Sequence, residues 1–184
     1  MDDIQAIYCL KRGDLSGLAV LMGRYQVKAA RAAFLVTGDT SLAQDVVQET
    51  FIRIVDRIEN FNETLPFEPY LIRSVINASL NAVRGNKRLI SLDGDTYELE
   101  NLLDQAVSVE SQVEFAELQQ KIMDALSRLP ARQRAAIVQR YYLGMNEKEM
   151  AASLDAAPGT VKWLLNAARE QLRQLLGQEG GFHD

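Results

Sequence analysis

Residues 129–176 read LPARQRAAIVQRYYLGMNEKEMAASLDAAPGTVKWLLNAAREQLRQLL, and this stretch decides the fold that we expect for the second half of the chain. A first helix over about 132–143 repeats apolar residues at helical spacing. It ends at Gly144, because glycine tolerates the left-handed conformation that follows many helices. Asn146 and Glu149 have the spacing of a capping box, which predicts that a short second helix begins there.

A third helix is predicted to begin at Gly159 or Thr160, after a break in the pattern at 155–158. Its apolar residues form one stripe, which predicts that this side packs on the preceding helices: Val161, Leu165, Ala168, Leu172 and Leu176. The order is typical of a helix-turn-helix, whose recognition helix presents outward residues of its first turns to the major groove of DNA. The candidate DNA-contacting residues are Thr160, Lys162, Trp163, Asn166 and Arg169. On this pattern alone, a plain three-helix bundle stays open.

The net charge of −5 does not favour a nucleic-acid partner, because phosphate contacts need Lys and Arg. The charge is unevenly distributed, however. Eight acidic and no basic residues lie between Arg88 and Lys121, whereas residues 121–176 carry nine basic and five acidic side chains. The acidic run predicts a linker. We therefore expect an all-α chain with two small helical domains at 1–88 and 113–178, an acidic flexible linker at 89–112 and a tail at 179–184.

The composition excludes several classes of function. Cys9 is the only cysteine and His183 the only histidine, so the chain has no disulfide framework and no metal-ligand spacing. No convergent set of nucleophile and base exists either, and we expect neither catalysis nor a cofactor nor a metal. The longest apolar runs are about five residues, which predicts no membrane insertion and a cytoplasmic protein.

The first half of the chain contains a helix over about 41–58 with a broad apolar face. Its opposite face carries polar residues, among them Asp45, Gln48, Glu49 and Arg53. A loop with two prolines follows, and its aromatic residues either anchor the loop on a core or provide platforms for unpaired bases. The next helix is predicted to expose two arginines and two asparagines, which can contact phosphates and base edges. The loop aromatics are Phe61, Phe67 and Tyr70, and the exposed residues are Arg73, Asn77, Asn81 and Arg84.

The order AQDVVQETF, FN, PF, YLIR and NxxR in the first half, followed by LPxRxR, xxEMA and PGTVK in the second, resembles the extracytoplasmic-function (ECF) group of bacterial RNA polymerase sigma factors of the sigma-70 family. The resemblance implies that Asp45, Gln48, Glu49 and Arg53 dock on a coiled coil of the beta-prime subunit of core RNA polymerase. It also implies that the loop and the following helix open promoter DNA and hold a flipped base. These residues are Phe61, Phe67, Tyr70, Arg73, Asn77, Asn81 and Arg84.

The resemblance predicts a sigma factor that directs transcription initiation at a subset of genes and is held by an anti-sigma protein. The recognition helix departs from the family, because Leu164, Ala167 and Gln171 stand where arginine is common and Trp163 replaces a small polar residue. Two large apolar residues exposed together would mark a partner surface, so we hypothesise that Trp163 and Leu164 bind an anti-sigma protein. The alternative for Trp163 and Leu164 is that both residues pack onto the preceding helices. The alternatives for the function of the chain are a sigma-like decoy that does not support transcription and a helix-turn-helix repressor.

Overall fold

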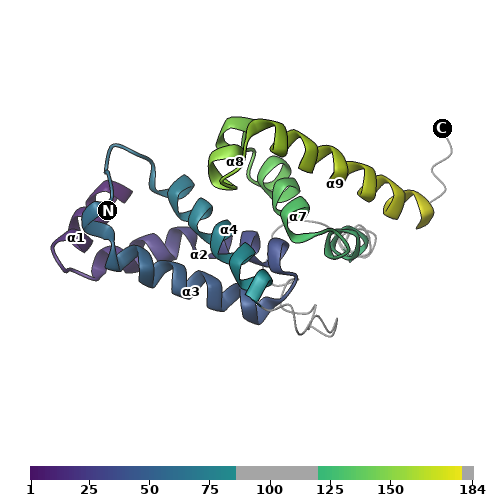
Figure 1. Cartoon of the computed structure of the whole chain (residues 1–184). Coiled ribbons are helices and arrows are strands. Elements are labelled where there is room, and N and C mark those ends of the chain that lie inside the picture. Colours follow the sequence, from purple (N-terminus) through teal and green to yellow (C-terminus); the bar gives the residue numbers. More distant parts are fainter. Residues whose placement is uncertain (86–119, 180–184) are drawn as a thin grey trace. The chain divides into compact units, whose positions relative to one another are not determined.

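A computed structural model describes residues 1–85 and 120–179 of the 184-residue chain (Figure 1). These residues form helices joined by turns and loops, with no strand among them, which confirms the all-α prediction. The chain divides into two compact units, Met1–Ser91 and Leu92–Asp184. The predicted linker at 89–112 lies outside the described residues, as does the tail from residue 180 onward.

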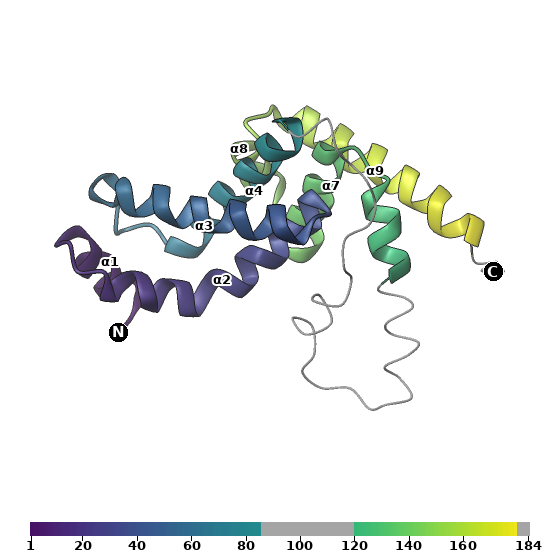
Figure 2. The ribbon, with the colours of Figure 1, turned by 90° about the horizontal axis from the view of Figure 1, so that it is seen from below.

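The first unit contains α1 (Asp3–Lys11), α2 (Ser16–Thr37), α3 (Thr40–Asp56), the short 3-10 helix η1 (Ile58–Asn60) and α4 (Phe67–Gly85). The long helix α2 contacts α1, α3 and α4, and α3 also packs on α4 (Figure 2). Gly38 ends α2 in the left-handed conformation, with φ of 72°. Asp39 then caps α3 by accepting a 2.8 Å hydrogen bond from the Leu42 amide, as residue types at a helix start predict.

The described part of the second unit consists of helical residues 120–127, α7 (Ala131–Ile137), the π-helical turn η2 (Val138–Tyr142), α8 (Glu147–Ser153) and α9 (Pro158–Glu179). Gly144 has a φ of 66°, and Asn146 and Glu149 form the predicted capping box at the start of α8. Both α7 and α8 pack on α9, which is the predicted helix-turn-helix arrangement. The first of its helices is not regular throughout, because its last turn is widened to a π-helical turn.

The buried stripe of α9 is shorter than its sequence pattern predicts. Val161, Leu165 and Ala168 are buried, but Leu172 is only half-buried and Leu176 is exposed. The reason is length: α9 has 22 residues and the two helices that pack on it, α7 and α8, have seven each. Among the described residues, no helix combines the length and apolar character needed to cross a membrane.

Candidate functional site

The outer face of α3 is polar and open to solvent. Asp45, Gln48 and Glu49 are all exposed, and Arg53 forms an ion pair with Glu49 one turn away on the same helix. The opposite side of α3 is buried in the first unit, through Val46, Val47, Phe51 and Ile54. Because the packing side and the polar side are separate, the polar side chains of α3 are available to a partner without unfolding the unit.

The three aromatic residues of the loop form one cluster at the start of α4. The ring centroids of Phe61 and Tyr70 are 4.9 Å apart, those of Phe61 and Phe67 are 5.9 Å apart, and Tyr25 of α2 joins the cluster 5.8 Å from Phe67. Phe61 and Phe67 are only 7% and 1% exposed, whereas Tyr70 is 36% exposed. Phe61 and Phe67 therefore anchor the loop on the core, which is one of the two alternatives left open by the sequence, and Tyr70 is the most exposed of the three rings.

The loop between these anchors has a defined turn. The side-chain oxygen of Asn62 accepts hydrogen bonds from the amide and the hydroxyl of Thr64, at 3.0 and 2.8 Å. The amide of Leu65 donates to the carbonyl of Asn62 at 3.1 Å, and the Leu65 side chain is exposed at the tip. From outside the loop, the ammonium group of Lys11 donates to the carbonyl of Phe61 at 2.8 Å. Sequence patterns gave no sign of this last contact, because the two residues are 50 positions apart.

A row of polar residues runs along α4 from the loop towards its end. Arg73, Asn77, Asn81 and Arg84 recur at intervals of three or four residues, so they share one side of the helix. Arg73, Asn81 and Arg84 are exposed as predicted, whereas Asn77 is half-buried. This row contains no acidic residue, and it combines two cationic side chains with two amides that can donate and accept hydrogen bonds.

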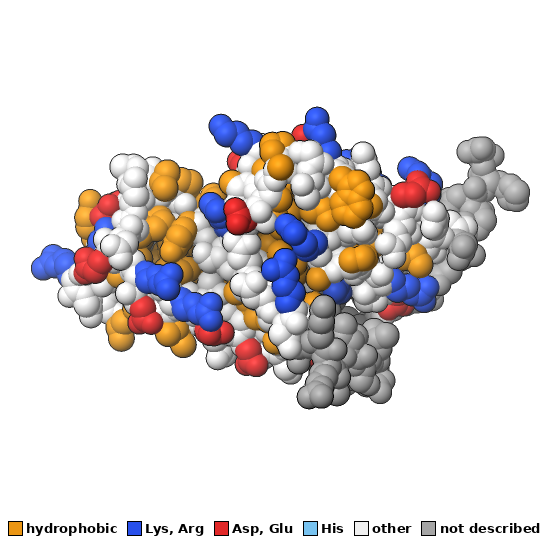
Figure 3. All heavy atoms as spheres, viewed as in Figure 1, with side chains coloured by type: hydrophobic (Ala, Val, Ile, Leu, Met, Phe, Trp, Pro, Cys, Tyr) orange, Lys and Arg blue, Asp and Glu red, His pale blue; other side chains and the backbone are white. Residues whose placement is uncertain are grey.

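The N-terminal turns of α9 present the other group of candidate residues. Thr160, Lys162, Trp163, Asn166 and Arg169 are all exposed, and Trp163 reaches 61%. Figure 3 shows hydrophobic and basic side chains next to one another over α8 and the start of α9. Lys162 lies 3.8 Å from Glu147 of α8, a distance at which the pair is loose and solvated.

Leu164 does not belong to this exposed surface. It is 4% exposed, because it lies three residues after Val161 and four before Ala168, on the side of α9 that faces the core. The predicted partner patch of Trp163 and Leu164 is therefore wrong in composition. Trp163 remains as a single large apolar side chain among polar neighbours.

Buried polar contacts hold α8 in place against the preceding helix. The amide nitrogen of Gln139, in the π-helical turn, donates to the hydroxyl of Ser153 at 2.8 Å, and both side chains are buried. Arg132 donates to the carbonyl of Leu154 at 3.3 Å, just after α8. Arg134 is also buried, and desolvation lowers the pKa of its guanidinium below the usual value. The hydrogen bonds of Gln139 and Arg132 hold α8 against the preceding helix, and a pattern of apolar residues could not have predicted them.

Within the two described stretches of chain, no three His, Cys, Asp or Glu residues are grouped so that they could hold a metal ion. The candidate surfaces consist of side chains suited to binding and orientation.

Comparisons with known proteins assign both units. Residues 21–89 match the family model of sigma-70 region 2, and residues 119–172 match the family model of sigma-70 region 4. The ECF RNA polymerase sigma-E factor of Escherichia coli strain K12 is 31% identical over 171 residues, which cover 89% of this chain and 88% of that protein. The chain belongs to the ECF sigma factors.

Other ECF sigma factors agree with this assignment. SigW of Bacillus subtilis strain 168 is 28% identical over 173 residues, which cover 91% of this chain and 92% of SigW. Among solved structures, the complex of CnrH with the cytosolic domain of CnrY has a TM-score of 0.66 at 22% identity and covers 97% of this chain and 99% of that one. RpoE of Bartonella quintana in complex with the anti-sigma factor NepR has a TM-score of 0.63 at 19% identity, with 86% and 96% covered.

The family assignment places the candidate residues within known regions of ECF sigma factors. Region 2 includes α3, the aromatic loop and α4, and region 4 includes α7, α8 and most of α9. Sigma factors are transcription initiation factors. Helix α1 precedes residue 21 and lies outside the region 2 match.

Proposed function

We propose that this ECF sigma factor binds core RNA polymerase, directs it to a subset of promoters and opens the DNA there, under the control of an anti-sigma protein. The observation that carries the proposal is the presence, in one chain, of two sets of largely exposed polar side chains. One set lies on α3 and α4 in region 2, and the other lies at the start of α9 in region 4.

The outer face of α3 binds the polymerase. Asp45, Gln48 and Glu49 project from the side of α3 that does not pack, and they would dock on a coiled coil of the beta-prime subunit. Arg53 forms an ion pair with Glu49, and because both side chains are exposed, a charged partner side chain can reach either of them. The exposed Asp45 adds a second acceptor one turn earlier.

The aromatic loop and α4 open the promoter. The row of Arg73, Asn77, Asn81 and Arg84 supplies cations for phosphates and amides for base edges, and Tyr70 at its beginning is exposed enough for a base to stack on its ring. Asn77 is half-buried, which restricts its rotamers and suits it to hold a base flipped out of the duplex. Phe61 and Phe67 support this surface from within.

The start of α9 reads the upstream promoter element in duplex DNA. Thr160 and Lys162 precede Trp163 in the first turn, and Asn166 and Arg169 follow on the same outward side. Amide and guanidinium groups can form two hydrogen bonds to one base, and Lys162 contributes a phosphate contact. Trp163 offers an apolar contact at a position where the family has a small polar residue. The methyl group of thymine is the apolar feature of the major groove, so it is the group that Trp163 would contact.

Reconstitution with core polymerase tests the proposal directly. Purified chain, core enzyme and fragmented genomic DNA should give transcripts whose 5′ ends, identified by sequencing, share a common upstream element. A sigma-like decoy would bind an anti-sigma protein and give no transcripts. A repressor would bind intact duplex without polymerase, and the outer face of α3 would then have no role.

Control by an anti-sigma protein is supported by two relatives in fold, since RpoE of Bartonella quintana was solved with the anti-sigma factor NepR and CnrH with the cytosolic domain of CnrY. Such a protein would cover the surfaces that bind polymerase or DNA. The exposed Trp163 offers it an apolar contact on region 4, although without Leu164 the patch is smaller than predicted. Loss of transcription on addition of the cognate inhibitor, restored by excess sigma factor, is the expected result.

A further inference from the structure

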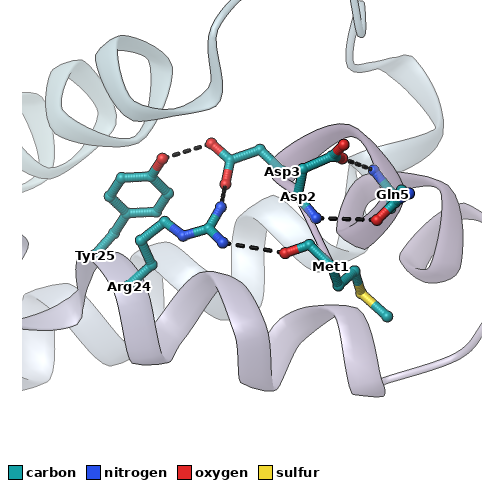
Figure 4. A network of polar contacts seen from close by, with 6 residues as sticks. All are labelled: Met1, Asp2, Asp3, Gln5, Arg24 and Tyr25. Carbon is teal, nitrogen blue, oxygen red and sulfur yellow. Dashed lines mark hydrogen bonds and ion pairs between the residues drawn. The ribbon is translucent and has the colours of Figure 1, made fainter.

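Helix α1 is firmly seated on α2 at its N-terminal end. The carboxylate of Asp3 accepts hydrogen bonds from the guanidinium of Arg24 and from the hydroxyl of Tyr25, and Arg24 also donates to the carbonyl of Met1 at 3.1 Å (Figure 4). Asp2 adds a capping box with Gln5, which makes the first turn of α1 rigid. These contacts hold the N-terminus of α1 to the side chains of α2.

The middle of α1 lies directly against the α2 backbone. A Cβ atom placed on Gly17 of α2 would lie 2.1 Å from the carbonyl oxygen of Ala6 in α1, so any side chain at position 17 would push the two helices apart. Ile7 and Leu10 are buried on the same side of α1. With two of its turns fixed in this way, α1 has little freedom to move its C-terminal end.

That C-terminal end holds the aromatic loop of region 2. The ammonium group of Lys11 donates to the carbonyl of Phe61 at 2.8 Å and to the carboxylate of Glu63 at 2.7 Å. Both side chains are well covered, with Lys11 17% and Glu63 28% exposed. The hydrogen bond from Lys11 is the main cause that lowers the pKa of the Glu63 carboxyl below its usual value.

The contact falls where the loop lacks other support. Phe61 and Phe67 fix its two ends by burial, and the Asn62 turn shapes its interior, but residues 62, 64, 65 and 66 are exposed. Among the residues that the structure describes, Lys11 is the side chain from another helix that forms hydrogen bonds to this part of the loop. It fixes both the backbone at Phe61 and the side chain at Glu63.

We propose that α1 and Lys11 form a brace that holds the aromatic loop in its DNA-binding conformation, so that Lys11 is a positioning residue for promoter opening. The proposal rests on the proposed function of region 2 and adds a residue that lies outside the residues matched to it. The physical reason is preorganisation, because a loop that is already ordered does not have to be ordered when it captures unpaired bases.

Substitution of Lys11 tests the brace. Lys11→Met keeps the aliphatic stem and removes both hydrogen bonds, whereas Glu63→Gln removes the ion pair and leaves the bond to the Phe61 carbonyl. Lys28→Met is the matched control, since Lys28 of α2 also pairs with a glutamate, but this partner, Glu68 in the first turn of α4, lies outside the exposed segment 62–66 that Lys11 contacts. Each variant is assembled with core polymerase and assayed on a promoter identified with the wild-type holoenzyme.

The first measurement is hydrogen exchange of the backbone amides of residues 62–65 in the full chain, since Pro66 has no amide hydrogen. We expect faster exchange in Lys11→Met, a smaller change in Glu63→Gln and none in Lys28→Met. The second is the rate of open-complex formation. It should fall about three- to tenfold for Lys11→Met on duplex promoter, the magnitude of a typical net hydrogen-bond contribution, with a smaller loss on a template already melted at that site.

Unchanged exchange in Lys11→Met would overturn the brace. So would faster exchange with normal open-complex formation, because the loop would then not need to be held. An equal loss of opening in Lys28→Met would show a general effect of helix packing. If the wild-type holoenzyme opened no promoter, the proposed function itself would fail, and hydrogen exchange would still decide whether Lys11 orders the loop.

Discussion

The two DNA-facing surfaces of this sigma factor are built differently. In region 2, two of the three loop aromatics are buried and the loop is tied to α1 by Lys11, so the binding surface is part of the packing of the unit. In region 4, the candidate residues at the start of α9 are exposed and the helix is held by the residues behind them. Substitutions in the loop should therefore change folding and binding together, whereas those on α9 can change binding alone.

The largest predicted effect is a difference in stability between substitutions at two adjacent residues of α9, one buried and one exposed. Leu164→Arg should unfold region 4, at a cost of more than about 3 kcal/mol, because it removes a buried side chain and places a charge in the core. Trp163→Ser should change stability by less than about 0.5 kcal/mol, as is usual for exposed positions. Thermal unfolding of each full-length variant, followed by circular dichroism, measures both.

The Trp163→Ser variant also shows which partner the Trp163 ring binds. A folded Trp163→Ser protein that binds duplex promoter less well would assign the ring to DNA. A protein that binds DNA normally but escapes its inhibitor would assign the ring to the anti-sigma protein. A lost thermal transition in Trp163→Ser would contradict the separation of packing and binding on α9.

The second prediction concerns polymerase binding by α3. Asp45→Arg combined with Gln48→Ala should abolish co-elution with core polymerase and leave the thermal transition of the protein unchanged, because both side chains project away from the packed side of α3. Glu59→Arg, on η1, makes the same change of charge at another exposed position and should bind normally. Wild-type affinity in the double variant would place the docking surface elsewhere.

Local signals in the sequence were sufficient for much of the fold. Gly38 and Gly144 end their helices in the left-handed conformation, and Asn146 with Glu149 starts α8, because each of these effects depends only on residues within one helical turn. The order of the motifs also identified the family that the comparisons confirm. Such features are predictable because the neighbours that matter are neighbours in the sequence.

Contacts between distant segments could not be predicted in this way. Leu164 was misjudged because it lies at the margin of the apolar stripe of α9, where a small rotation of the helix decides burial. The hydrogen bond between Gln139 and Ser153 and the bond from Lys11 to Phe61 join separate helices or loops, and a polar residue in a sequence does not reveal its partner. These contacts position the candidate sites. The sequence therefore predicted which residues belong to the sites, but not how they are arranged in space.

The third prediction separates base capture from support in region 2. Asn77→Ala should slow open-complex formation on duplex promoter about five- to tenfold, the loss expected for one hydrogen bond of about 1 kcal/mol. The effect should be smaller on a template already melted at that site, because capture then does not compete with pairing. The measurement is the rate of open-complex formation on the two templates, with Gln26→Ala, an exposed amide of α2, as control. Equal losses on both templates would indicate a backbone contact or a folding defect.

The smallest predicted effect is a loss of region 2 stability at acid pH, caused by protonation of Glu63 in the loop. The pKa of Glu63 is lowered in the folded protein, mainly by the hydrogen bond from Lys11, so the folded state binds the proton of this carboxyl less well than the unfolded state does. The stabilisation is therefore complete above the ordinary carboxyl pKa, and it is lost as the pH falls from about 5 through the lowered pKa. Glu63→Gln should lower the melting temperature of region 2 slightly at pH 7, and the melting temperatures of the two proteins should converge as the solution is acidified. If the difference in melting temperature between wild type and Glu63→Gln stays constant down to pH 3, Lys11 holds the loop through the Phe61 carbonyl alone. The loop of region 2 is then supported by one contact instead of two.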